Sequence, residues 1–185
     1  MSSVNFLISI FFNLYIMVFL MRLWLEAYGV GPYNPLSQSI GKLTQPIVGP
    51  LQRSTPSIGR FNLGTMLFVY SLCVVKLTLL MAVSSYSSPA IKVQYLLLSL
   101  LSLLKHSGEL VFWVLLIRSI LSWKNRDRSA VEHIFSQITE PLLIPIRKFL
   151  PEIEGVDLSV LVVFVSLQFA NFLLGDIVGT AWSIF

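Results

Sequence analysis

Charged residues are scarce in this sequence. They make up 12% of its 185 residues, while hydrophobic residues make up 55%. Soluble domains carry about twice this share of charge, so the composition excludes an ordinary soluble domain. Histidine occurs only twice and cysteine only once, at Cys73. A lone cysteine forms no internal disulfide, and the three side chains are too scattered for a zinc site.

Recognisable catalytic patterns are also lacking. The serines have no histidine and aspartate at a matching depth, and Cys73 has no adjacent base, so nucleophilic catalysis is not expected. The glycines form no phosphate-binding loop. The net charge of +4 comes without basic stripes interleaved with aromatic residues, which argues against nucleic acid as a partner. We therefore expect a non-enzymatic protein without cofactors.

What the sequence does have is long apolar runs. A membrane crossing needs about 20 mainly apolar residues, and four segments qualify or nearly qualify: residues 6–25, 63–83, 95–121 and 158–175. The third run is overlong and carries charges in its middle, so it is either one long helix or a helix broken by a re-entrant piece. We expect an all-α polytopic membrane protein with four transmembrane helices.

The second half of the chain repeats the first. Residues 44–63 read TQPIVGPLQRSTPSIGRFNL, and residues 139–158 read TEPLLIPIRKFLPEIEGVDL. In a constant register the threonine, three prolines, one isoleucine and the last leucine are identical. Each copy follows an apolar run with an arginine (Arg22, Arg118) and precedes another apolar run. The sequence predicts two parallel hairpin repeats, residues 1–90 and 91–185.

Each proline-rich loop should begin with an amphipathic helix in the membrane interface. Asn34 and Pro35 indicate one helix start, and Ser129 with Glu132 forms a capping-box pattern at the other. Apolar residues then recur at helical spacing, at Leu36, Ile40, Leu43 and Ile47 in the first loop and at Val131, Ile134, Phe135, Ile138 and Leu142 in the second.

Prolines are expected to end both helices. Gln45 and Glu140 each precede a proline, which disfavours helical backbone, so the helices should stop near Thr44 and Thr139. A second short, kinked element should follow over the Pro-x-x-x-Pro spacing. We interpret the loops as stiff elbows, and also as a docking surface for another membrane protein, with the loop shape fixed by Pro46, Pro50, Pro141 and Pro145.

Basic residues gather in the two proline-rich loops, and Lys92 alone lies in the opposite loop. This bias predicts a multi-pass protein of the inner (plasma) membrane with both large loops cytoplasmic and both termini outside. The expected partners are membrane lipids and other integral membrane proteins, and a homo-oligomer is left open. The residues expected to contact anionic lipid or an acidic partner are Lys42, Arg53, Arg147 and Lys148.

Four ionisable residues fall inside apolar runs, where each charge costs about 2.5–3.5 kcal/mol or more. Lys105, His106 and Glu109 have helical spacing, and Lys76 on another span is expected to share Glu109. Three interpretations remain open for this cluster. It is a buried polar network, an ion or proton path, or a haem site built on His106. The last would need a second histidine at similar depth, and His133 lies in a loop.

The repeated residues resemble the YggT family, also called the YlmG family, of small bacterial integral membrane proteins. The second copy departs from the pattern, with Ser129–Ala130 in place of the Asn–Pro step and Ile144 in place of Gly49. The matching residues are Arg22, Trp24, Asn34–Pro35, Thr44–Gln45–Pro46, Pro50, Arg53 and Pro56, then Arg118, Trp123, Thr139–Glu140–Pro141, Pro145, Arg147–Lys148 and Pro151.

The resemblance implies a membrane protein without an assigned reaction. Plastid relatives are associated with covalent haem attachment to a cytochrome b-type subunit and with nucleoid distribution, and bacterial members with cell division or osmotic tolerance. We therefore expect a scaffold or assembly factor for other membrane proteins, related to division, cytochromes or envelope and osmotic stress. The alternative is a small ion or proton pathway linked to osmotic balance and formed by a dimer.

Overall fold

Six helices and one pair of very short strands make up the part of the chain that the computed structural model describes, which is residues 3–31, 33–58, 61–83, 93–124, 130–148, 158–179 and 182. In chain order the elements are α1 (Ser3–Ala27), α2 (Pro35–Ser54), β1 (Ser57–Ile58), β2 (Phe61–Asn62), α3 (Leu63–Val83), α4 (Val93–Lys124), α5 (Ala130–Arg147) and α6 (Leu158–Val178). The strands pair antiparallel over two residues each.

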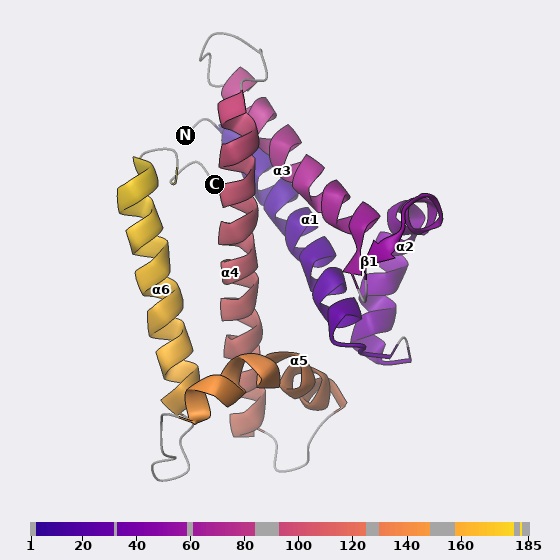
Figure 1. Cartoon of the computed structure of the whole chain (residues 1–185), viewed down its shortest axis with the longest axis vertical. Coiled ribbons are helices and arrows are strands. Elements are labelled where there is room, and N and C mark those ends of the chain that lie inside the picture. Colours follow the sequence, from indigo (N-terminus) through magenta and orange to yellow (C-terminus); the bar gives the residue numbers. More distant parts are fainter. Residues whose placement is uncertain are drawn as a thin grey trace.

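Four of these helices, α1, α3, α4 and α6, are long and apolar enough to cross a membrane. The four segments predicted as spans are therefore long apolar helices, and the fold is all-α apart from the two-residue strands. The overlong third run is one helix of 32 residues. Figure 1 shows that α1 and α4 run in one direction and α3 and α6 in the other.

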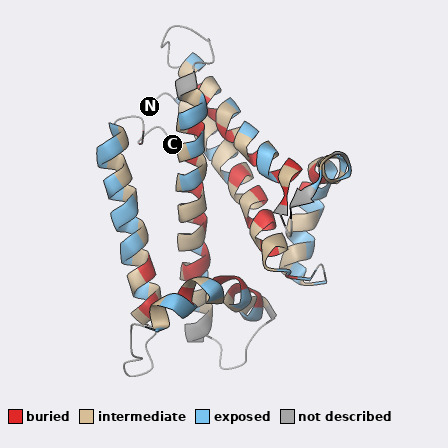
Figure 2. Cartoon of the chain, in the orientation of Figure 1, coloured by how far each residue is buried: buried red, intermediate tan, exposed pale blue. Residues whose placement is uncertain are grey.

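The spans are packed unequally. Between α1 and α3, fully buried side chains interlock, among them Phe19 and Val69, and the rings of Phe19 and Phe68 lie 5.0 Å apart. In contrast, α6 buries only Ser159 and Val163, and Figure 2 shows most of its length exposed or half-buried. The first hairpin is thus a close pair of helices, whereas α6 stands more loosely beside α4.

The two amphipathic helices, α2 and α5, which we call the elbow helices, do not end where the prolines predict. Pro46 and Pro50 lie inside α2, and Pro141 and Pro145 lie inside α5. The expectation that the helices stop near Thr44 and Thr139 is therefore wrong. A proline removes one backbone hydrogen bond and bends a helix, but does not always end it, and α5 changes direction along its length (Figure 1).

The start of α2 is correctly predicted, but its cap is not. Pro35 is the first helical residue and Asn34 the cap position, yet the Asn34 side chain makes no capping bond and donates instead to the Gly31 carbonyl at 3.4 Å. In the predicted apolar stripe, Leu43 is 67% exposed. The second predicted capping residue, Ser129, lies outside the described residues. The apolar stripe of α5 buries Ile134, Phe135 and Ile138 against α1 and α4.

A tight contact between α2 and α3 provides a test of this fold. A Cβ at Gly64 would lie 2.4 Å from Thr55 Oγ1 and 3.2 Å from the Leu51 carbonyl. We expect Gly64→Ala to force the end of α2 away from α3 and to lower the melting temperature in detergent by several degrees. The control is Gly41→Ala in α2, where the added methyl meets nothing within 4 Å and favours the helix by about 1 kcal/mol. Equal melting temperatures for the two variants would contradict this contact.

Candidate functional site: two elbows and a divided polar cluster

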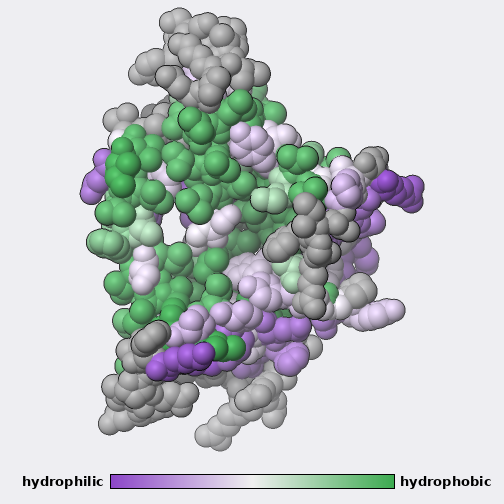
Figure 3. Space-filling view, viewed as in Figure 1, coloured by the Kyte–Doolittle hydropathy of each residue, from purple (hydrophilic) through white to green (hydrophobic). Residues whose placement is uncertain are grey.

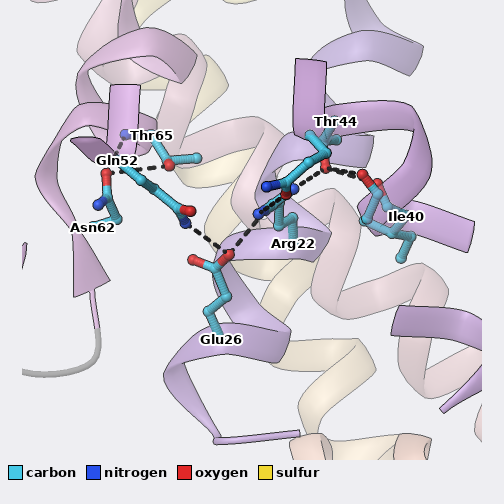
Figure 4. A network of polar contacts seen from close by, with 9 residues as sticks. Arg22, Glu26, Ile40, Thr44, Gln52, Asn62 and Thr65 are labelled. Carbon is cyan, nitrogen blue, oxygen red and sulfur yellow. Dashed lines mark hydrogen bonds and ion pairs between the residues drawn. The ribbon is translucent and has the colours of Figure 1, made fainter. Parts of the chain in front are cut away.

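Arg22, in the last two turns of α1, ties the first elbow helix to its span. Its Nη1 donates to Thr44 Oγ1 at 2.5 Å and its Nη2 donates to Gln45 Oε1 at 2.9 Å. Its Nε donates to Glu26 Oε1 at 2.8 Å. Thr44 is fully buried, and its own hydroxyl proton goes to the Ile40 carbonyl at 2.7 Å. Figure 4 shows this network between α1 and α2.

Arg118 makes the same connection for the second elbow helix. Its Nη1 donates to Thr139 Oγ1 at 2.5 Å and its Nη2 donates to Glu140 Oε2 at 3.0 Å. Thr139 is also fully buried and donates to the Phe135 carbonyl at 2.6 Å. We call each set an arginine clamp, namely Arg22 with Thr44 and Gln45, and Arg118 with Thr139 and Glu140.

The clamps explain why helical backbone continues through the pre-proline positions. Gln45 and Glu140 precede Pro46 and Pro141, and both are bound by the arginine of the preceding span. These tertiary contacts oppose the preference of a pre-proline residue for extended backbone. The sequence pattern showed the arginine and the threonine in both copies, but it gave no indication that they bind one another.

The arginine of each clamp also pairs with one carboxylate, and the two carboxylates come from different elements. In the first, Glu26 lies on the span itself and also accepts from Gln52 Nε2 at 3.4 Å. In the second, Glu140 lies on the elbow helix and bridges Arg118 to Arg147, whose Nη1 is 2.5 Å from Glu140 Oε1. Arg147, expected to contact lipid or a partner, is therefore half-buried in the clamp.

The other predicted loop residues lie on the outer faces of the elbow helices. Lys42 and Arg53 on α2 and Lys148 after α5 are exposed, and none has an ion pair within the described part of the chain. The four prolines predicted to fix the loop shape are exposed beside them, namely Pro46, Pro50, Pro141 and Pro145. In Figure 3 hydrophilic surface gathers over α5, whereas α6 and α4 present hydrophobic surface.

The predicted intramembrane cluster is divided between two sides of α4. On one side, α4 meets α1 and α3. Lys76 Nζ donates to Asn13 Oδ1 at 2.7 Å, and His106 Nε2 lies 2.9 Å from the same oxygen and 3.5 Å from Nζ. His106 Nδ1 donates to the Ser102 carbonyl at 2.7 Å. Lys76 and His106 are 2% and 0% exposed, so this part joins three spans in a closed polar contact.

On the other side of α4, Lys105 and Glu109 face α6. Lys105 Nζ donates to the Trp182 carbonyl at 3.1 Å and lies 5.3 Å from the centre of the Trp182 ring. Both side chains line a cavity of about 440 Å³ between α4 and α6. Adjacent helical residues point about 100° apart, which separates Lys105 from His106. The expected sharing of Glu109 by Lys76 is not formed, because Lys76 is bound to Asn13 instead.

Two participants in these contacts were not predicted as site residues. These are Asn13, which lies on the apolar span of residues 6–25, and Trp182, which lies after the last span. A second cavity of about 500 Å³, between α1, α3 and α4, is lined almost entirely by apolar residues. Among the described residues, no group of three metal-ligating side chains comes together.

The clamps can be tested by isosteric substitution. We expect Thr44→Val and Thr139→Val each to lower the free energy of unfolding by about 1.5–3 kcal/mol, because a guanidinium loses a hydrogen-bond acceptor. Thr78→Val is the matched control, since Thr78 Oγ1 donates only to the Val74 carbonyl within α3. Denaturant or thermal unfolding in detergent measures the difference, and equal effects at Thr44 and Thr78 would show that the clamp contributes nothing.

Comparisons with known proteins agree with the resemblance seen in the sequence. The sequence model of the CCB3/YggT family matches residues 1–83 and 97–178. The "Uncharacterized protein in proC 3'region" of Vibrio alginolyticus is 54% identical over 182 residues, 98% of each chain. The "Uncharacterized protein YggT" of Escherichia coli K12 is 39% identical over 171 residues, 92% of this chain and 88% of that one. No solved structure matches. The chain belongs to the CCB3/YggT family.

Proposed function

We propose that this protein is a non-enzymatic scaffold or assembly factor, which binds other integral membrane proteins through its two elbow helices. The carrying observation is the contrast between the two faces of each elbow helix. The inner face is fixed to a span by an arginine clamp. The outer face exposes prolines and basic side chains, including Lys42 and Lys148. A rigid element with an exposed basic face suits recognition of acidic partners or anionic lipid.

The placement of the protein follows from its charges. Lysine and arginine concentrate in the two elbow segments, which favours a cytoplasmic position for both and an outside position for both termini. We propose the bacterial inner membrane, since the relatives that match are bacterial proteins. The two elbows would then lie in the same interface, each at the end of a parallel hairpin repeat.

A binding role also fits the chemistry of the buried polar groups. His106 is held by Asn13, Lys76 and the Ser102 carbonyl inside closed helix packing, where a substrate has no access. The candidate processes are division, cytochrome assembly and envelope or osmotic stress. The identity of the partner that is recovered with the protein would show which of these processes it takes part in.

The test is charge neutralisation on the outer faces. We expect the triple variant Lys42→Gln, Arg53→Gln, Lys148→Gln to lose recovery of a chemically cross-linked membrane partner while keeping its own level and melting temperature. At about 1 kcal/mol for each basic residue near an anionic surface, binding should fall on the order of 100-fold. Lys92→Gln in the opposite loop is the control. Undiminished recovery with the triple variant would remove the elbow faces from the function.

The alternative function is a small ion or proton pathway formed by a dimer. The observation that favours it is the contact of Asn13, Lys76 and His106 across three spans, because buried ionisable residues in membranes often move protons. If this is the function, vesicles containing the protein should show proton or ion flux that Glu109→Gln or His106→Asn reduces at least tenfold while the protein still assembles. Flux equal to that of empty vesicles would exclude the pathway.

A further inference from the structure

The cavity between α4 and α6 contains the carboxylate of Glu109, on which Lys105 and Lys76 act electrostatically from a distance, without direct contact. Glu109 lies near the middle of its span and is half-buried. Within the described part of the chain it makes no hydrogen bond and no ion pair, although Lys105 and Asn171 line the same cavity. Figure 3 shows the surface hollowed between these two helices. A charge at this depth is costly unless a partner or water meets it.

Comparison of the two repeats indicates what kind of group binds Glu109. The register that aligns Arg22 with Arg118 places Asn13 opposite Glu109, and the register that aligns Leu63 with Leu158 places Lys76 opposite Asn171. In the first repeat this pair is closed, because Lys76 Nζ donates to Asn13 Oδ1 at 2.7 Å. In the second repeat the pair stays open.

The two members of the open pair do not bind each other. Asn171 Oδ1 accepts from Trp182 Nε1 at 3.0 Å, and Lys105 Nζ is bound to the Trp182 carbonyl. The second repeat therefore has no ammonium group at the position equivalent to Lys76, and Glu109 and Asn171 both line the cavity. The complement of that carboxylate is a cationic side chain.

The outer side of α6 likewise lacks the cover that α3 receives. In the first repeat α4 packs on α1 and α3 and brings His106 to Asn13 at 2.9 Å. No described helix takes the corresponding place against α6, where Phe169 and Phe172 are 67% and 68% exposed.

The cavity lining extends over about ten residues of α4, roughly 15 Å of helix, which is long enough to hold several side chains of a neighbouring span.

We propose that the α4–α6 cavity receives a transmembrane helix of a partner protein, which presents a lysine or arginine at the level of Glu109. This inference rests on the proposed scaffold function and names the kind of partner that it binds. The Glu109 carboxylate accepts the basic side chain inside the membrane, and the apolar lining packs against the rest of the partner helix. Small residues beside Glu109 (Gly108 and Ala170) let that helix approach closely.

A second copy of the chain fits this position poorly. If α1 of a second copy took the place against α4 and α6 that α4 takes against α1 and α3, Ile10 would be the residue equivalent to His106. Its Lys76 is 2% exposed and bound to its own Asn13. A copy of this chain would therefore bring an apolar side chain to the carboxylate, and the charge would stay unpaired.

Site-specific photo-cross-linking in native membranes tests this proposal. A photoreactive residue at Leu167 reports on the cavity, and one at Leu161, 58% exposed and outside the cavity, is the control. We expect the Leu167 position to capture an apolar span of another protein that contains a lysine or arginine. Glu109→Gln should lower that yield on the order of tenfold, and Glu109→Lys with the partner's basic residue changed to glutamate should restore it.

A second variant guards against misfolding of Glu109→Gln. Ala170→Phe reduces the volume of the cavity while Glu109 itself is unchanged, and it should also abolish capture at Leu167 while the melting temperature is kept. Capture of a second copy of this chain, capture of lipid alone, or a yield that neither variant changes would each overturn the proposal.

A third photoreactive position separates this proposal from the scaffold function. Ile144, 47% exposed, lies on the outer face of α5 among the exposed prolines. A partner captured at Ile144 but not at Leu167 overturns the cavity proposal and leaves the scaffold function in place. If no protein is captured at Ile144 and none at Leu167, the cavity proposal and the scaffold function are both overturned.

Discussion

The structure depends first on a guanidinium group that binds a threonine hydroxyl, and it uses this interaction twice. Arg22 and Arg118 each lie near the end of an apolar span, where a charged side chain is costly without partners. Thr44 and Thr139 supply the acceptor, and each passes its own proton to a carbonyl one turn earlier. The elbow helix is thereby fixed to its span, which leaves the opposite face of the helix available for contacts.

The sequence predicted the helices well, because they arise from strong local signals. Apolar runs of about 20 residues define the spans, and helical spacing defines the elbow helices. The ends of the elbow helices were predicted wrongly, since the effect of Pro46 and Pro141 was judged from local backbone preference alone. The Arg22 and Arg118 contacts that override this preference are tertiary and could not be read from either motif.

The polar cluster shows a similar limit. Helical spacing placed Lys105, His106 and Glu109 on one helix. It did not indicate which neighbouring helix each side chain would face. In the structure, residues one position apart turn toward different helices, and Lys76 finds an amide oxygen of α1 in place of the expected carboxylate. The choice between Asn13 and Glu109 depends on how three spans pack, and that packing is a property of the whole bundle.

The two halves of the chain are packed unequally. The first closes around Lys76 and buries Phe19, whereas the second keeps a cavity of about 440 Å³ and buries little of α6. The sequence differences at equivalent positions, asparagine against glutamate and lysine against asparagine, lie where the packing differs. The helices of the first half are thus the more closely packed.

The spacing of the contacts along the chain also sets the order in which they can form. Arg22 and Thr44 are 22 residues apart, and Arg118 and Thr139 are 21 apart, so each clamp can close as soon as its own elbow has been synthesised. The contacts of Asn13 reach 63 and 93 residues ahead, and closing such distant contacts is slower. As the chain is synthesised, Thr44 therefore becomes available to its clamp first, Lys76 and His106 reach Asn13 next, and Thr139 completes the second clamp last.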